Sequence, residues 1–371
     1  MPQANRPDWS ERLKQIDAFC DAHDLDLLVV SAPSNVRYLT GFTGSSGLLA
    51  AGPRGRAFIT DGRYDAAVRG SIAEGLFASV DAVRVELRYD QTLATWLQHR
   101  QIARAGFEAG HVTVATLQRW QQFKPQIDWR PTEDVVERLR LIKDQDEQAI
   151  IRNAGRMLSD VARQLQSWIA AGRTERDVAH DVDRAIERAG FERPAFETIV
   201  AAGPNSAYPH ARPTDRPLAA GDLVLLDFGG VLDGYCVDLT RMAGIGQVGP
   251  AAETLLGAVS AAHAAAVRAV RPGALGCDVD RAAREVLESR NLGEAFLHGT
   301  GHGLGLDVHE GPRLARAESG AHDVLAAGMV CTIEPGAYLT GTGGVRLEDD
   351  VLVTADGCEL LTDAPRALIV I

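Results

Sequence analysis

Two acidic residues interrupt apolar segments in the second half of the chain. Asp227 follows the apolar run 223–226, and Asp238 stands in a second apolar segment shortly after it. A buried carboxylate without a partner is costly and takes up a proton, so two of them together indicate a shared cation. If the chain turns about Leu232 and Asp233, the two aspartates lie directly opposite one another, with Cβ atoms about 5 Å apart. We therefore expect both to bind metal; acids at a strand end or in a turn are the alternative.

A second group of chemically active residues lies in the glycine-rich segment 298–310. Three of the ten histidines of the chain, His298, His302 and His309, occur here among four glycines. Histidine supplies a neutral imidazole ligand or a proton carrier. Glycine lets backbone and substrate approach closely. His302, which has glycine on both sides, is the expected ligand, and a histidine packed in the core is the alternative.

Acidic residues near the C-terminus complete this set. Glu334 follows the apolar segment 330–333, and Arg346, Glu348 and Asp350 alternate along the next strand candidate, so they share a face. Four carboxylates and one imidazole suit Mn²⁺ or Co²⁺, with Zn²⁺ as a further alternative. Four negative ligand charges match two ions about 3.5 Å apart better than one.

The elements that must position these residues fall into two regions. In the first third, helix and strand candidates alternate, which predicts an α/β domain. The expected helices and strands are 10–22, 27–30, 41–49, 57–60, 92–99 and 114–123. From residue 146 an apolar face that includes Leu165 and Trp168 predicts one long helix ending at Gly172. A second helix is expected from an N-cap at Thr174 to Gly190.

The order of elements then repeats. Helices are expected over 251–270 and 278–290, followed by strands near 329–334 and 345–353. The pentapeptide Asp-Val-Asp-Arg-Ala occurs in the second helix of each half, at 181–185 and 278–282. We therefore expect an internal duplication in which two helix-helix-strand-strand halves face each other across one cleft.

Bulk composition limits the class of protein. With 371 residues, 46% of them hydrophobic, the chain has apolar material for two domains. A net charge of −12 argues against nucleic acid as a partner, because duplex binding depends on Lys and Arg. No apolar run is long enough for a signal peptide or a membrane span, so a cytoplasmic protein without membrane association is expected. The five cysteines are scattered and predict neither disulfides nor a zinc-thiolate site.

In order and wording, these motifs resemble the pita-bread metallopeptidases, which include methionine aminopeptidase, aminopeptidase P, prolidase and the metal-free creatinase. The match runs from about Asp144 to the C-terminus. Segments 34–42 and 60–64 look like the creatinase-type N-terminal domain of aminopeptidase P and prolidase. The resemblance implies an α/β creatinase-like domain (1–138), an α+β pita-bread catalytic domain with a pseudo-twofold duplication (139–371), the proline-specific branch, and a homodimer.

The resemblance also implies how the metal ligands divide. Asp227 would chelate one metal, Asp238 and Glu348 would bridge both, and His302 and Glu334 would hold the other. A hydroxide bridging the two ions, most simply Mn²⁺, would be the nucleophile. Glu334 would take its proton as general base and return it to the leaving amine as general acid.

Other positions match substrate-contacting residues of the family. His210 and His309 match histidines that contact the scissile carbonyl and the oxyanion, and His298 matches a residue of the proline pocket. Tyr338 and Arg346 match substrate-orienting positions, although Arg346 alternatively holds its acidic neighbours by charge-assisted hydrogen bonds. Polar residues of the N-terminal segments would help to form a dimer and narrow access to the site, or simply stabilise their own domain; they are Asn35, Tyr38, Asp61, Arg63 and Tyr64.

The expected function is that of an Xaa-Pro aminopeptidase, which removes the residue preceding proline from peptides with proline at the second position. An Xaa-Pro dipeptidase, or prolidase, is the alternative, and it would need a cation for the carboxylate of its substrate. Arg212, Arg313 and Arg346 are the candidates. A non-catalytic binding module or a metal-free amidinohydrolase is less consistent with a chain that keeps all five ligands.

Overall fold

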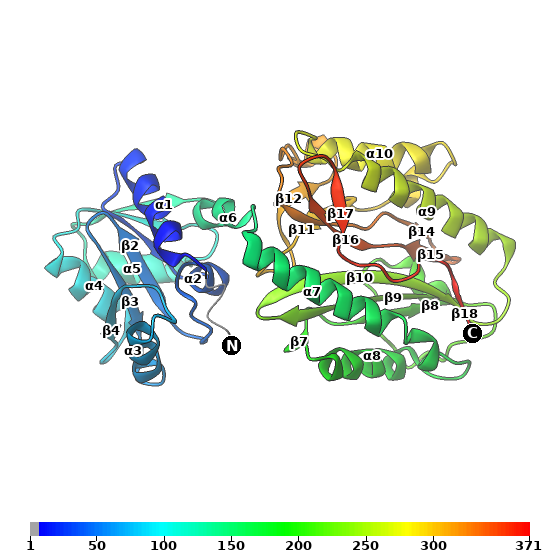
Figure 1. The fold of residues 1–371 in the computed structure, drawn as a ribbon, viewed down its shortest axis with the longest axis horizontal. Coiled ribbons are helices and arrows are strands. Elements are labelled where there is room, and N and C mark those ends of the chain that lie inside the picture. The colour runs from blue at the N-terminus through cyan, green and yellow to red at the C-terminus, as the bar shows by residue number, and fades with distance from the viewer. Residues whose placement is uncertain (1–6) are drawn as a thin grey trace. The chain divides into compact units, whose positions relative to one another are not determined.

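The computed structural model describes residues 7–371, and its internal contacts divide the chain after Arg140 into two units. The first unit is built on a mixed six-stranded sheet with the strand order β4-β3-β2-β1-β5-β6. Figure 1 shows this sheet with its helices. Its elements are α1 (Trp9–Ala22), β1 (Leu27–Val30), α2 (Pro33–Thr40), β2 (Leu48–Gly52), β3 (Gly55–Thr60), α3 (Asp65–Ala73), β4 (Asp81–Arg84), α4 (Tyr89–His99), β5 (Arg104–Glu108), α5 (Val114–Phe123), β6 (Asp128–Thr132) and α6 (Val135–Arg140).

The α/β class expected for this region is confirmed, because β1, β5 and β6 are parallel neighbours joined through helices. One expected strand is largely wrong. Residues 41–47 carry no strand, and β2 begins only at Leu48. Gly41 has φ +80 and ends α2 as a left-handed C-cap, so the glycine there terminates a helix.

The second unit opens with two helices. These are α7 (Gln145–Ala162) and, after the 3-10 turn η1 (Leu165–Ser167), α8 (Glu175–Ala189). The second begins as predicted, with Thr174 and Asp177 forming a capping box, and ends at Gly190 with φ +103. The prediction that the first continues to Gly172 is wrong.

Strands and a second helix pair follow in the second unit. The first strands and turns are β7 (Arg193–Pro194), β8 (Ile199–Ala202), η2 (Gly203–Ala207), β9 (Leu223–Leu232) and β10 (Tyr235–Gly244). Then come α9 (Pro250–Ala269), α10 (Gly276–Glu288), η3 (Gly293–Ala295), β11 (Gly301–Gly303), β12 (Glu310–Leu314), η4 (Ala317–Ser319), β13 (Val330–Ile333), β14 (Gly336–Leu339), β15 (Gly343–Arg346), β16 (Asp349–Val353), β17 (Cys358–Leu360) and β18 (Ile369–Val370). The order helix, helix, strands thus occurs twice, as the expected duplication requires.

Strand β9 separates two hydrophobic cores. Val224, Leu226 and Phe228 pack into the core with α7 and α8, whereas Leu223 and Leu225 pack into the core with α9 and α10. Figure 1 shows the two helix pairs on opposite sides of the strands. Because side chains alternate along a strand, Asp227 shares the face of Leu223 and Leu225. The buried run thus carries one carboxylate onto the side where the second half of the unit packs.

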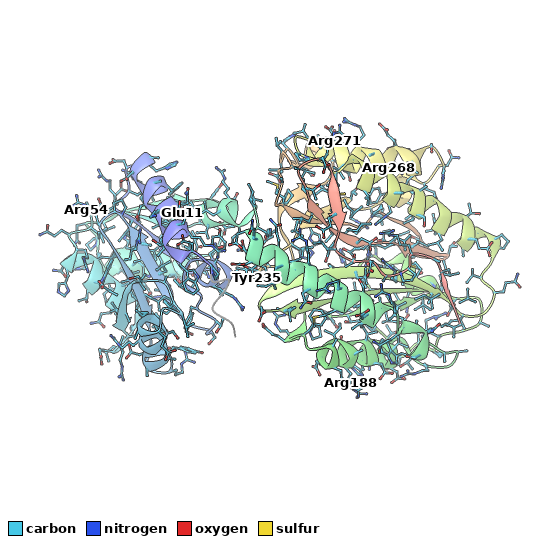
Figure 2. The ribbon with its side chains drawn as sticks, viewed as in Figure 1. Glu11, Arg54, Arg188, Tyr235, Arg268 and Arg271 are labelled. Carbon is cyan, nitrogen blue, oxygen red and sulfur yellow. The ribbon has the colours of Figure 1, made fainter. Side chains whose placement is uncertain are left out.

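Further contacts fasten the ends of these elements. Tyr235 lies at the start of β10 (Figure 2). Its hydroxyl donates to Glu147 Oε1 at 2.7 Å, and Glu147 also belongs to the capping box of α7. All five cysteines are free, as expected. Among residues 7–371, no helix has both the length and the apolar character needed to cross a membrane.

Candidate metal centre

The hairpin of β9 and β10 carries two of the predicted ligands, but its register differs from the expected one. Asp227 pairs with Thr240, and Asp238 pairs with Gly229. The prediction that the two aspartates lie directly opposite one another is therefore wrong. They are diagonal neighbours, two positions apart, and their side chains still lie on the same face of the hairpin.

The sequence of the turn explains this register. Asp233 and Gly234 occupy the two central positions, with φ +46 and φ +79. Two positive φ angles define the tight hairpin turn for which Asp-Gly is a preferred sequence. The turn is therefore centred one residue later than the expected Leu232–Asp233, which shifts every pairing of the hairpin by two positions.

Glu348 approaches this hairpin from the C-terminal region. It lies in the break between β15 and β16, and its Oε2 accepts a hydrogen bond from Thr240 Oγ1 at 2.7 Å. Asp350 Oδ2 accepts from the backbone N–H of Asp238 at 2.9 Å. Glu348 and Asp350 thus face the hairpin together, although the regular strand that was expected to carry them is interrupted.

Three predicted ligands meet in one cluster. Asp238, His302 and Glu348 each offer a ligand atom, and these atoms all lie within 4.8 Å of one another. His302 Nδ1 lies 3.0 Å from the carbonyl oxygen of Gly303, which favours a proton on Nδ1. His302 Nε2, left with its lone pair, lies 3.4 Å from Oε1 of Glu334. The structure therefore brings Glu334 to the edge of the same cluster.

Several buried oxygens at this site have no hydrogen-bond partner among residues 7–371. They are Asp227 Oδ1, Asp238 Oδ1, Glu348 Oε1 and Asp350 Oδ1. A buried carboxylate oxygen without a partner is rare in a folded protein and costs free energy. Oxygen donors of this kind are the ligands that hard divalent cations accept. The donor set therefore fits divalent metal ions held by the five predicted ligands.

The electrostatics of the cluster support the same interpretation. Burial raises the pKa of Asp238 well above that of an ordinary aspartate, and the charges of Glu348 and Asp227 raise it further. Burial likewise raises the pKa of Glu348 and of Glu334. Burial lowers the pKa of His302, which favours the neutral imidazole that a metal requires. Metal ions would supply the positive charge that these crowded carboxylates need.

A chain of polar contacts leads away from Asp227. The guanidinium of Arg346 contacts Asp227 Oδ2 through Nη2 and donates through Nη1 to the hydroxyl of Tyr338 at 2.7 Å. The Tyr338 hydroxyl also lies 2.8 Å from His298 Nε2. Arg346, Tyr338 and His298 therefore form a chain of contacts that begins at one predicted ligand.

The two remaining predicted residues lie near the same cluster. The His309 ring stands 4.3 Å from the His302 ring, centroid to centroid. His210 is exposed in the loop after η2, beside Pro209, whose carbonyl accepts from Arg346 Nη1 at 3.1 Å. Burial lowers the pKa of His309. The neighbouring His302 lowers it further, and His210 makes a smaller contribution.

The N-terminal polar residues form contacts inside their own unit. Asn35 Nδ2 donates to Glu108 Oε1 at 2.7 Å, and Arg63 pairs with Asp61 at 2.8 Å. Tyr38 donates to the carbonyl of Leu139 at 3.1 Å, and Tyr64 contacts Ser45 at 2.9 Å. These contacts agree with the alternative in which the residues stabilise their own domain.

Sequence reasoning missed Thr240 and the buried cluster around Asp349. Thr240 bonds both Glu348 and, at 3.2 Å, Arg346 Nε. The run Glu348-Asp349-Asp350 signals unusual burial of charge, but two of its partners, Asp238 and Arg241, lie more than a hundred residues away in β10, which no local pattern reveals.

Comparison with known proteins identifies both units. Residues 149–355 match the model of metallopeptidase family M24, and residues 12–142 match the creatinase/prolidase N-terminal domain. An Xaa-Pro dipeptidase of Pyrococcus furiosus is 32% identical over 97% of this chain and 99% of its own length.

Solved structures agree over the whole length. An Xaa-Pro dipeptidase from Bacillus anthracis has a TM-score of 0.93 and 30% identity over 98% of this chain and 100% of its own. An X-Pro aminopeptidase from Thermotoga maritima has a TM-score of 0.85 and 30% identity over 94% of this chain and 98% of its own. The expected creatinase-like and pita-bread domains are thereby confirmed, and the chain belongs to metallopeptidase family M24.

Proposed function

We propose that this chain is an Xaa-Pro dipeptidase that uses two divalent metal ions, with Mn²⁺ as the first candidate. Membership of a metallopeptidase family and the cluster of Asp238, His302 and Glu348 support metal-dependent peptide hydrolysis. The similarity to Xaa-Pro dipeptidases over nearly the full length favours the dipeptidase alternative over the aminopeptidase expected first. Free dipeptides with proline in second place are then the substrates.

Metal ions at this site would lower the pKa of bound water and polarise the scissile carbonyl. Asp227, Asp238, His302, Glu334 and Glu348 would hold them. Glu334 has a further role, because burial raises its pKa and thereby favours the uptake of a proton by its carboxyl group. Its Oε1 would carry that proton toward the leaving amine.

Neighbouring side chains would orient the substrate. His298 and Tyr338 form a hydrogen-bonded pair whose tyrosine is buried, and Arg346 locks the tyrosine hydroxyl from the other side. Such a fixed pair provides a rigid wall for the proline ring. His309, beside His302, would stabilise negative charge that develops on the carbonyl oxygen.

The placement of Arg313 carries the choice of a dipeptidase. Arg313 pairs with His302 across β11 and β12, so the two side chains lie on the same face of this sheet. Arg313 is exposed, and its guanidinium forms no ion pair among residues 7–371. Arg346, by contrast, is bound to Asp227, and Arg212 is paired with Glu197 at 3.3 Å. Of the three candidate arginines, Arg313 is thus the one left available to a substrate carboxylate.

A substrate series of graded length tests this proposal. We expect kcat/KM for Ala-Pro to exceed that for Ala-Pro-Ala, because only the dipeptide places its carboxylate at the residue after the scissile bond. Arg313→Gln should raise KM for Ala-Pro about tenfold or more, since it removes a charge-assisted hydrogen bond worth about 1.5 to 3 kcal/mol.

The matched control is Arg212→Gln, another exposed arginine, which should leave KM for the dipeptide unchanged. A clear preference for Ala-Pro-Ala, with both variants behaving as wild type, would replace the dipeptidase by the Xaa-Pro aminopeptidase. The similar fold of an X-Pro aminopeptidase supports that alternative.

A further inference from the structure

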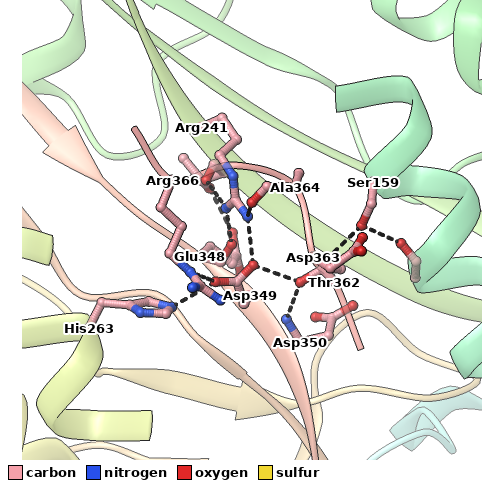
Figure 3. A network of polar contacts seen from close by, with 12 residues as sticks. Ser159, Arg241, His263, Glu348, Asp349, Asp350, Thr362, Asp363, Ala364 and Arg366 are labelled. Carbon is pink, nitrogen blue, oxygen red and sulfur yellow. Dashed lines mark hydrogen bonds and ion pairs between the residues drawn. The ribbon is translucent and has the colours of Figure 1, made fainter. Parts of the chain in front are cut away.

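A second polar cluster lies behind the predicted metal ligands and is not part of them. Its centre is Asp349, a fully buried carboxylate at the start of β16 (Figure 3). Asp349 Oδ1 accepts from Arg241 Nη2 at 2.7 Å and from Thr362 Oγ1 at 2.8 Å. Asp349 Oδ2 contacts Arg366 Nε, and His263 Nε2 lies 3.1 Å from it. Four side chains from three parts of the chain, β10, α9 and the segment after β17, thus converge on one carboxylate.

The charges in this cluster are paired, unlike those at the metal centre. Burial alone would raise the pKa of Asp349, yet His263, Arg241 and Arg366 hold it well below the usual value for aspartate. Both oxygens of Asp349 are engaged by side chains, and these contacts keep its partners in fixed positions. The neighbouring carboxylates of Glu348 and Asp350 face the hairpin of β9 and β10, where buried oxygens remain without partners.

Arg241 connects the two clusters. Its Nη1 donates to the carbonyl oxygen of Glu348 at 2.6 Å and to that of Thr240 at 2.9 Å. Glu348 lies between two strands, and its own N–H makes only a 3.3 Å contact with the Thr240 carbonyl. The backbone of this predicted ligand is therefore held by the Thr240 carbonyl and by the guanidinium of Arg241, which Asp349 helps to orient.

Segment 361–366 packs against Asp349 and contributes Thr362 and Arg366 to its cluster. The Ala364 carbonyl accepts from Arg241 Nη2 at 2.7 Å, so the segment contacts both Asp349 and Arg241. Thr362 Oγ1 also accepts from the N–H of Asp350 at 3.1 Å. The segment is fixed in turn by the Asp363 N–H, which donates to Ser159 Oγ of α7 at 3.0 Å.

We propose that segment 361–366 positions Glu348 for metal binding, acting through Asp349 and Arg241. Thr362 and Arg366 are positioning residues: they touch neither substrate nor metal, and they fix the residues that fix the ligand. This inference rests on the metal centre of the proposed function, but not on its substrate.

The test measures the affinity of metal-free protein for Mn²⁺ by titration calorimetry. Arg366→Gln removes one contact to Asp349, and Thr362→Val removes another at nearly constant volume. Each should weaken Mn²⁺ binding about tenfold, the lower end of the range seen when groups that orient metal ligands are removed. Thr362→Ser, which keeps the hydroxyl, should restore affinity.

Arg163→Gln is the matched control. Arg163 is as exposed as Arg366, with 40% and 37% of the side chain accessible, and it binds Asp363 of the same segment but not Asp349. Its Mn²⁺ affinity should stay within about twofold of wild type. If Thr362→Val does not fold, the half-exposed Arg366 still provides the test.

The outcomes separate this inference from a purely structural role and from the proposed function. If Arg366→Gln and Thr362→Val lower only the unfolding temperature and bind Mn²⁺ as tightly as Arg163→Gln, the inference is wrong. If the predicted order of affinities holds while the wild-type protein cleaves no Xaa-Pro peptide, the positioning role stands and the proposed substrate fails. A wild-type chain that takes up no Mn²⁺ overturns both.

Discussion

Asp227, Asp238 and Glu348 each keep a buried oxygen without a hydrogen-bond partner among residues 7–371. Asp349, equally buried and adjacent to Glu348, has its charge fully paired. The contrast separates carboxylates that need a cation from one that the fold itself neutralises. Residue types and spacing selected the former as candidate ligands. They could not reveal the role of Asp349, because its partners Arg241 and His263 come from the distant elements β10 and α9.

Metal-free protein should lose stability as pH rises. Burial raises the pKa of Asp238 and Glu348 above the unfolded values of about 4, so the native state keeps protons that the unfolded chain releases. Between about pH 4 and the raised pKa, the free energy of unfolding should fall by about 1.4 kcal/mol per pH unit for each retained proton. Urea denaturation from pH 7 to pH 8 measures this slope, because the histidines, whose lowered pKa values act in the opposite sense at lower pH, are neutral there in both states.

Asp238→Asn should make that slope shallower, whereas Asp356→Asn, at an exposed loop position, should leave it unchanged. A metal-free Asp238→Asn variant with the same slope as the wild type would contradict the assignment of a raised pKa to Asp238.

Glu334→Gln should lower kcat strongly while the chain stays folded. The amide keeps the size of the side chain but cannot carry a proton, so kcat should fall about 10²- to 10⁴-fold. Steady-state kinetics on Ala-Pro measure the loss. Glu359→Gln, which alters an exposed glutamate of β17 paired with Arg152, should retain wild-type rates. Wild-type kcat in Glu334→Gln would remove this residue from the reaction.

The β9 and β10 hairpin shows what can be predicted at the level of an element. The apolar run identified both strands, but the register was misplaced because the turn was centred on Leu232–Asp233 instead of Asp233–Gly234. The expected end of α7 failed for a different reason. Leu165 and Trp168 continue its helical spacing, yet they lie in and after the 3-10 turn η1, and Leu165 is buried in the same core. Periodicity of buried residues does not distinguish a continued helix from a packed turn.

Gly234→Ala should destabilise this hairpin. Gly234 has φ +79, a conformation in which a Cβ atom costs about 1 to 2 kcal/mol. Gly257→Ala is the control, because Gly257 lies inside α9 with no atom within 4 Å of its added Cβ, and alanine there should add about 0.5 to 1 kcal/mol. Denaturant unfolding of both variants measures the two effects. Equal changes would show that the turn does not require its glycine.

At the scale of the whole molecule, family M24 accounts for the catalytic unit and the creatinase/prolidase domain for the first unit. The two-domain architecture was predictable because each unit has its own pattern of elements and its own motifs. The length of the substrate was not predictable from the sequence, because in the proposed function it depends on which arginine binds the substrate carboxylate. The homodimer stays a prediction of the family resemblance, and sedimentation analysis of the full chain would measure it.

The central claim is that two metal ions, held by Asp227, Asp238, His302, Glu334 and Glu348, are required for cleavage of Xaa-Pro peptides. Its most direct test is to remove all metal from the purified chain and titrate Mn²⁺ back while following Ala-Pro hydrolysis and bound metal together. We predict no hydrolysis without metal and full activity at two equivalents per chain, with Asp227→Asn binding fewer. Undiminished hydrolysis by the metal-free chain would contradict the claim.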